Sequence, residues 1–221
     1  TKAEKKFGSE ILFHIDAVQS YGKMSVLAGT ADLLTVSGHK IHGPKGVGAH
    51  YVRKGLTIHP YLIGGGQERG LRSGTENVPA IAGFGVAAEL CRRNMDRRIE
   101  IMKKAKAYLS EGIRSEIPDI RFNSTEQGSP SILNVSFLGV RGEVLLHALE
   151  QSEIYVSTGS ACSSRKRGQS SVLKAMGLSD KEIEGAIRFS FSEFNTEDEM
   201  DYVLEKLKTE VKKLRKLGSF R

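Results

Sequence analysis

The sequence is poor in cysteine and contains no long apolar run. Its 221 residues include two cysteines, Cys91 and Cys162, which form neither a disulfide framework nor a metal-ligand pattern. This usage is typical of a reducing compartment, so we expect a cytoplasmic protein. No apolar stretch approaches the ~20 residues that a membrane-spanning helix requires, so we expect no membrane contact. The opening residues, TKAEKK, lack the apolar core of a secretory signal.

Aromatic residues are also scarce, at 7%, although the net charge is +7. Positive charge gathers in residues 92–106, 165–167 and 206–216, and acidic residues are interleaved in the first and last of these segments. Interleaved charges are typical of solvated helix faces. No aromatic-rich nucleic-acid motif accompanies the charge, so we expect no direct nucleic-acid partner. Binding of these basic segments to an acidic protein or to an RNA is the less favoured interpretation.

The spacing of apolar residues predicts an α/β chain with a first domain at 1–100 and a second one at 101–221. Short apolar runs indicate strands buried on both faces. A spacing of three and four from Val78 to about Ile117 predicts one long amphipathic helix that contains the domain boundary. Cys91 lies on its apolar stripe, so we expect a buried side chain. The expected strands are 11–15, 32–36, 47–52, 132–138, 154–157 and 186–191. The other expected helices are 142–150, 170–176 and 200–214, the last one capped by Thr196 and Glu199.

Polar side chains follow the first two expected strands. Asp16 ends the first strand, and Lys40 follows the second; open α/β sheets place ligand sites at such strand ends. A lysine in a partly dry pocket can act as an amine nucleophile. A lysine for a Schiff base and an acid for a pyridinium nitrogen are what a pyridoxal phosphate site requires. From spacing alone, a solvated Lys40 and a turn-capping Asp16 remain an alternative.

Five segments, taken together, resemble the cysteine desulfurases of the NifS/IscS type, which are pyridoxal phosphate enzymes of the class V aminotransferase group. The resemblance runs in the same order across nearly the whole chain. It implies the C-terminal part of a fold-type I transferase: part of the cofactor-binding large domain, then a small C-terminal α/β (α+β) domain that carries a cysteine loop. The segments are HIDAVQS (14–20), SGHKIHGPKG (37–46), GGGQERGLRSGTEN (64–77), STGSACSS (157–164) and IRFS (187–190).

The resemblance implies a role for each matching residue around the cofactor. Lys40 matches the lysine that forms the Schiff base, and Asp16 matches the partner of the pyridine nitrogen. Gln19 matches the residue that bonds the phenolic oxygen of the cofactor. Ser37 and His39 match phosphate ligands. A metal site at His39 is not expected, because glycine and proline surround it.

Three more matches concern the partner subunit, the substrate and sulfur. Thr75 matches a residue that reaches the phosphate of the other subunit in a homodimer. Arg188 matches the arginine that binds the substrate carboxylate, and an arginine inside an apolar strand is hard to explain without an anionic partner. Cys162 matches the sulfur-accepting cysteine; its small polar neighbours favour an accessible loop, and the cations at 165–167 favour its thiolate.

The implied activity converts L-cysteine to L-alanine and leaves a persulfide on Cys162. The sulfur would pass to an acceptor protein, an iron–sulfur scaffold or a tRNA-thiolation enzyme. The alternatives are a related selenocysteine lyase or β-lyase and a non-catalytic fragment or module that docks a sulfur acceptor. In the family the lysine lies well past the middle of the large domain, whereas here it is at position 40. We therefore expect this chain alone to bind the cofactor weakly or not at all and to be inactive.

Overall fold

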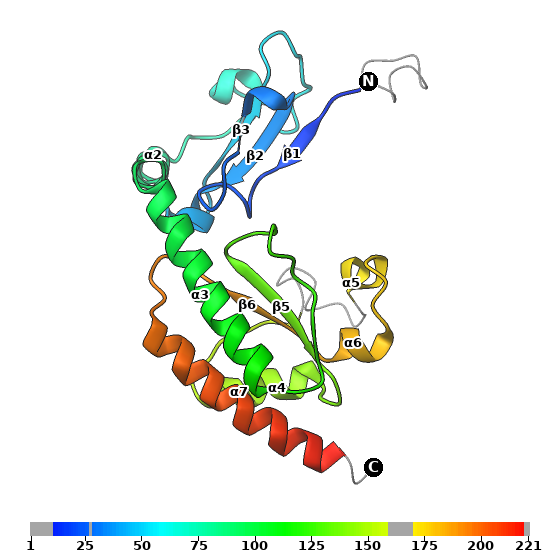
Figure 1. Cartoon of the computed structure of the whole chain (residues 1–221). Coiled ribbons are helices and arrows are strands. Elements are labelled where there is room, and N and C mark those ends of the chain that lie inside the picture. Colours follow the sequence, from blue (N-terminus) through cyan, green and yellow to red (C-terminus); the bar gives the residue numbers. More distant parts are fainter. Residues whose placement is uncertain (1–10, 27, 159–169, 219–221) are drawn as a thin grey trace. The chain divides into compact units, whose positions relative to one another are not determined.

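The structure is a computed structural model that describes residues 11–26, 28–158 and 170–218. The chain divides into two compact units, residues 1–95 and 96–221, which we describe separately (Figure 1). Each unit is built around a three-stranded sheet. None of the helices in these described ranges is both long enough and apolar enough to cross a lipid bilayer.

The sheet of the first unit has the order β1-β2-β3, and its strands lie where the apolar runs predict them. Strands β1 and β2 are parallel, whereas β2 and β3 are antiparallel. The strands are β1 (His14–Asp16), β2 (Leu33–Ser37) and β3 (Gly48–Val52), and short 3-10 helices occur at η1 (Ala28–Thr30), η2 (Gly38–Ile41) and η3 (Gln67–Gly70).

The two faces of this sheet differ in polarity. Leu34 and Val36 are buried on one face, where they pack with Ala17 and Phe84. Alternate residues of a strand point to opposite faces, so the residues between them, with Asp16 on β1, form a polar face. Asp16 and most of β3 are exposed. The prediction that these strands are buried on both faces is therefore wrong for the described residues, because both end residues of β1 and most of β3 are exposed.

The expected long helix is two helices, α2 (Val78–Arg93) and α3 (Met95–Glu116). The break falls at Asn94, whose backbone and side-chain nitrogens both donate to the carbonyl oxygen of Leu90. Asparagine competes in this way with the helical hydrogen-bond pattern, and it favours helix ends. Cys91 is 1% exposed, which confirms that it is a buried residue.

The sheet of the second unit has the order β4-β5-β6 and is antiparallel throughout. Its strands are β4 (Ile120–Phe122), β5 (Ile132–Phe137) and β6 (Ala186–Ser190). One face carries Leu133, Val135 and Phe137, each at most 1% exposed. These side chains share one core cluster with residues of α3, α4 (Gly142–Glu150) and α7 (Glu197–Gly218). The period-two alternation of β5 thus builds the main core of the unit.

The expected strand at 154–157 is wrong, because a single residue of it pairs with the sheet. The backbone N–H of Ile154 donates to Leu149 of α4 at 3.1 Å, so the start of the segment closes the end of that helix. Only Ser157 pairs with β6, in an isolated bridge to Arg188. Strand β4 and helix α6 (Asp180–Glu184) were not expected, and α5 (Ser171–Ala175) lies inside the expected helix.

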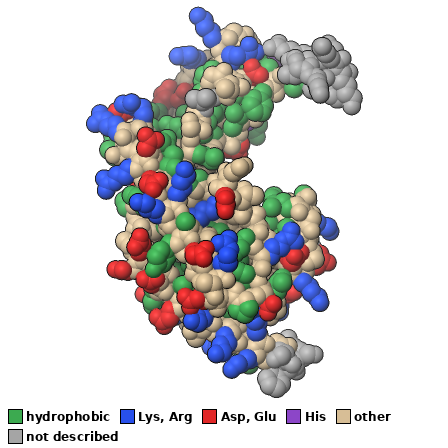
Figure 2. Space-filling model, viewed as in Figure 1, with side chains coloured by type: hydrophobic (Ala, Val, Ile, Leu, Met, Phe, Trp, Pro, Cys, Tyr) green, Lys and Arg blue, Asp and Glu red, His purple; other side chains and the backbone are tan. Residues whose placement is uncertain are grey.

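Charges on the helices of the second unit are mostly exposed and paired, as their interleaving predicts. Lys208 contacts Glu116 at 2.6 Å, and Figure 2 shows basic and acidic side chains intermingled over the visible face. Arg98 does not lie on a solvated helix face, contrary to the prediction. It is 7% exposed, and its guanidinium contacts Glu193 at 3.0 Å. The third basic segment, 165–167, lies outside the described residues. The Thr196–Glu199 cap is confirmed, with each side chain accepting from the other residue's backbone N–H.

Candidate active site

The candidate cofactor residues of the first unit gather after β1 and β2. Asp16 ends β1, and its Oδ1 accepts from the backbone N–H of Val18 at 3.0 Å, which fixes the carboxylate. Ser37 ends β2, and its Oγ lies 2.9 Å from Nδ1 of His39. Lys40 follows in η2 and is half-buried, whereas His39 is exposed. Because β1 and β2 are adjacent and parallel, Asp16 and Ser37 lie at the same edge of the sheet, and His39 and Lys40 follow Ser37.

The turn that presents Lys40 depends on its local sequence. A Cβ atom at Gly38 would lie 3.1 Å from Val47 and 3.2 Å from the carbonyl oxygen of Pro44, so the close approach of the chain favours glycine there. His42 ends η2 in a left-handed conformation with φ 67°, and its N–H donates to the carbonyl oxygen of Gly38. This compact turn limits the positions that the Lys40 backbone can take.

A hydrogen-bonded row of side chains crosses the polar face beside Asp16. Thr35 lies opposite both Asp16 and His50 in the register of the sheet. Its Oγ1 is 2.9 Å from Nε2 of His14 and 2.9 Å from Nδ1 of His50. None of these three residues was predicted to take part in the site. Their alternation with buried residues is the signal that places them on the face of Asp16.

The residues at and after the ends of β1 and β2 fit pyridoxal phosphate. An amine at Lys40 and a fixed carboxylate at Asp16 suit the aldehyde and the ring nitrogen of the cofactor. Ser37 and His39, already hydrogen-bonded to each other, offer donors for a phosphate. Gln19 is exposed in the turn after β1. Thr75 is exposed ahead of α2, and among the described residues no hydrogen bond joins it to the group around Lys40.

Arg188 lies in β6 of the second unit and is half-buried. Its backbone pairs with Asn134 on β5 and, through the isolated bridge, with Ser157 on the other side. The Nε atom of Arg188 is buried, and it has no hydrogen-bond partner within the described parts of the chain. A guanidinium carries five donors and no acceptor. Arg188 is therefore positioned to bind an anion from outside this set of residues.

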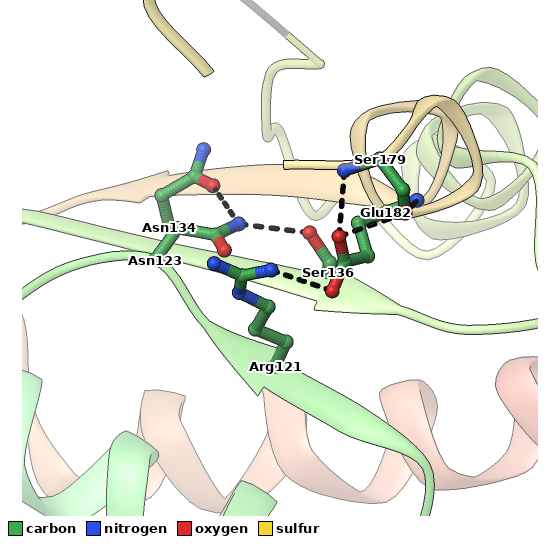
Figure 3. Close-up of polar contacts among 6 residues, drawn as sticks. All are labelled: Arg121, Asn123, Asn134, Ser136, Ser179 and Glu182. Carbon is green, nitrogen blue, oxygen red and sulfur yellow. Dashed lines mark hydrogen bonds and ion pairs between the residues drawn. The ribbon is translucent and has the colours of Figure 1, made fainter. Parts of the chain in front are cut away.

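Arg121, on the same sheet, has an acidic partner of its own. Its guanidinium lies 2.6 Å from Oε1 of Glu182. The other carboxylate oxygen, Oε2, accepts from the backbone N–H and the hydroxyl of Ser179 at 2.7 Å each (Figure 3). The hydrogen bond from Arg121, followed by those from Ser179, lowers the pKa of Glu182 from 4.5 to about 2. This group ties α6 to β4, and it distinguishes a structural arginine from Arg188.

We expect Arg121→Ala to lower the melting temperature at neutral pH and to have little effect near pH 2. Because the pKa of Glu182 is depressed in the folded state to about 2, the carboxylate stabilises the fold above its ordinary pKa of 4.5. That contribution is lost as the pH falls from about 4.5 towards 2. Thermal unfolding of the wild type and the variant across this range measures the difference. Lys104→Ala, which removes a more exposed pair with Glu100 at 3.7 Å, is the control and should change little. A difference that grows on acidification would contradict the assignment.

Cys162, the expected sulfur acceptor, lies in 159–169, outside the described residues. Its role is not tested by the structure and stays a prediction, as do the roles assigned above to the residues of the two sheets. The other cysteine, Cys91, packs with Ile41 and Ala87. A nucleophile at Cys91 would have no access to a substrate, so its burial leaves Cys162 as the candidate.

The chain is similar to known proteins over nearly its whole length. A family profile described as Aminotransferase class-V matches residues 2–203. The chain is 44% identical to a cysteine desulfurase of Trichormus azollae over 213 residues, which cover 95% of this chain and 53% of that protein. It is 42% identical to cysteine desulfurase IscS of Clostridium botulinum over 213 residues, which cover 94% and 54%.

Solved structures show the same relationship. The fold is similar to that of a NifS-like protein, with a TM-score of 0.83 and 40% identity over 95% of this chain and 54% of the other. A NifS-like protein from Rickettsia africae ESF-5 also gives a TM-score of 0.83, with 32% identity over 96% and 56%. The chain spans about half the length of the curated relatives it matches. The expected α/β fold of NifS-like pyridoxal phosphate-dependent transferases is thus confirmed, and the chain belongs to the aminotransferase class-V family.

Proposed function

We propose that the whole protein is a pyridoxal phosphate-dependent cysteine desulfurase that converts L-cysteine to L-alanine. The observation that carries the proposal is the grouping of Asp16, Ser37, His39 and Lys40 after two adjacent parallel strands. The relatives named cysteine desulfurase support the reaction. This chain would supply one side of the cofactor site, and we expect it to bind the cofactor weakly when alone. A site that lacks part of its donors loses hydrogen bonds and the dry surroundings that strengthen them.

Each residue of the first unit would have a distinct task. Lys40 would attach the cofactor through Nζ and, once the substrate amine has replaced it, would move the proton of the α-carbon. Asp16 would keep a proton on the ring nitrogen, and Ser37 and His39 would donate to the phosphate. When bound there, pyridoxal phosphate supplies an electron sink for bonds at the substrate α-carbon. Gln19 would donate to the phenolic oxygen.

Sulfur transfer would then use Arg188 and Cys162. Arg188 would bind the substrate carboxylate through two parallel hydrogen bonds, which a guanidinium provides and an ammonium does not. The thiolate of Cys162 would attack the substrate sulfur, forming an S–S bond while the bond from that sulfur to Cβ breaks. The electron pair of the broken bond stays with the carbon, and protonation yields alanine. The products balance as L-alanine and one persulfide.

The persulfide would pass to an acceptor protein, either an iron–sulfur scaffold or a tRNA-thiolation enzyme. We also propose a homodimer in which Thr75 reaches the phosphate bound by the partner subunit, and a cytoplasmic location. The exposed position of Thr75 ahead of α2 is compatible with a contact across a subunit interface.

Mass spectrometry of the whole protein after exposure to L-cysteine tests the proposed activity. We expect a mass increase of one sulfur atom, removal of that mass by a reductant, and one alanine formed for each sulfur released. Production of pyruvate and ammonia would favour a β-lyase instead. If the purified protein shows no visible absorbance from the cofactor after incubation with pyridoxal phosphate, a non-catalytic docking role would replace the proposal.

A further inference from the structure

Asn134 lies directly opposite Arg188 in the pairing of β5 with β6. Residues opposite each other on antiparallel strands share a face, with Cβ atoms about 5 Å apart. The flanking residues Leu133 and Val135 are buried in the core on the other face. Asn134 and Arg188 are therefore neighbours on the polar face of the second sheet, away from its main core.

The side chain of Asn134 is held in one orientation by Asn123. The Nδ2 atom of Asn123 donates to Oδ1 of Asn134 at 2.7 Å and to Oγ of Ser136 at 2.8 Å (Figure 3). The backbone of Asn123 also donates to the carbonyl oxygen of Asn134 at 2.9 Å. Because the side-chain oxygen is used in this way, Nδ2 of Asn134 points away from Asn123 in Figure 3. It donates to none of the residues that the structure describes.

Two side chains with donors thus lie opposite each other, and no hydrogen bond between described residues uses the Nε of Arg188 or the Nδ2 of Asn134. The Nε of Arg188 and the amide NH₂ of Asn134 are both donors and cannot bond to each other. The Oδ1 atom of Asn123 is a buried acceptor without a partner in the described residues, and it belongs to the amide that holds Asn134. Arg121 shows how this sheet satisfies an arginine that needs no ligand, because Glu182 lies 2.6 Å from it. Among the described residues, no acid is paired with Arg188. An acceptor with several lone pairs and a negative charge would satisfy both groups.

We propose that Asn134 and Arg188 form a subsite for the α-carboxylate of the amino-acid substrate. Arg188 supplies the charge, and Asn134 supplies a neutral second donor. Asn123 and Ser136 are positioning residues that hold the Asn134 amide. The inference rests on the proposed function in taking an amino acid as the ligand. It adds a specificity: the paired donors favour a carboxylate over a carboxamide, which has a single oxygen and a competing NH₂ group.

The test compares L-alanine with L-alaninamide, each titrated into the cofactor-loaded whole protein and followed by the absorbance of the cofactor. We expect Asn134→Ala to weaken L-alanine binding about tenfold, the usual effect of losing a hydrogen bond to a charged group. L-Alaninamide binding should change less than about twofold. For L-cysteine turnover, KM should rise about tenfold while kcat changes little.

Asn134→Asp gives a second variant that keeps the acceptor oxygen for Asn123. Its negative charge should weaken L-alanine binding more than Asn134→Ala does, while L-alaninamide binding is retained. Asn195→Ala is the matched control, since it removes an amide of the same unit that accepts from the Ser192 N–H at 2.9 Å. It should lower stability without changing the preference for L-alanine.

Two results would overturn the subsite. One is an equal loss of L-alanine and L-alaninamide affinity in Asn134→Ala, which would make Asn134 a structural residue. The other is unchanged L-alanine binding in both Asn134 variants. Failure of the proposed function is distinguishable, because the wild type would then bind L-alanine but release no sulfur from L-cysteine.

Discussion

Lys40→Ala should abolish the covalent attachment of pyridoxal phosphate and lower L-cysteine turnover by at least about a thousandfold. Lys40 is a half-buried lysine in the compact turn after β2, next to the Ser37–His39 pair. Alanine removes both the amine that holds the cofactor and the base that moves the α-proton. Reduction of the whole protein with borohydride, followed by peptide mass mapping, measures the attachment.

Two further variants make this test specific. Lys40→Arg keeps the positive charge but has no amine that can form a Schiff base, so it should lose the adduct as completely as the alanine variant. Lys45→Ala removes an exposed lysine of the same turn region, and it should keep both the adduct and the turnover. An adduct found on Lys45 in the wild type would make the assignment of Lys40 wrong.

Cys162→Ser should stop persulfide formation and sulfide release while leaving cofactor absorbance and amino-acid binding intact. A serine hydroxyl remains protonated at neutral pH and cannot form the S–S bond, whereas the cations at 165–167 favour a thiolate at Cys162. Peptide mapping after treatment with L-cysteine should place the extra sulfur on the peptide that contains Cys162 in the wild type.

Cys91→Ala is the matched control for this prediction. Cys91 is 1% exposed and packs against Ile41, so its truncation should cost on the order of 1 kcal/mol of stability through a small cavity. Turnover should remain close to that of the wild type. Extra sulfur on Cys91, or undiminished turnover in Cys162→Ser, is the result that would rule out Cys162 as the acceptor.

Local sequence patterns predicted most of the elements that carry these residues. The strands ending at Asp16 and Ser37 and the helix start at Val78 were visible as apolar runs and spacing. The break at Asn94 was not, because the apolar spacing continues across it while the hydrogen bonds of its amide end the first helix. Strand β4 has three residues, too few to show a period. The segment at 154–157 looks like a strand, yet its first N–H bonds to α4.

Some residues of the candidate site could be predicted from local sequence motifs, and others depend on how distant strands pair. Residues matched to family motifs, such as Lys40 and Arg188, could be named from the sequence alone. Asn134 could not, since its position beside Arg188 is set by the pairing of strands that lie far apart in the chain. The same holds for Thr35, which joins two histidines of other strands. Strand register, rather than local propensity, determines these neighbours.

The two-faced sheet of the first unit couples folding to the accuracy of the site. A slip of β2 by one residue against β1 would turn every side chain of β2 to the opposite face. Leu34 and Val36 would then be exposed, and Ser37 would point into the apolar cluster. Burial of Leu34 and Val36 therefore disfavours this shifted register, and the same burial keeps the predicted cofactor residues on their own face of the sheet. A substitution that disturbs the register of β1 and β2 should therefore lower the stability of the fold before it alters the chemistry of the site.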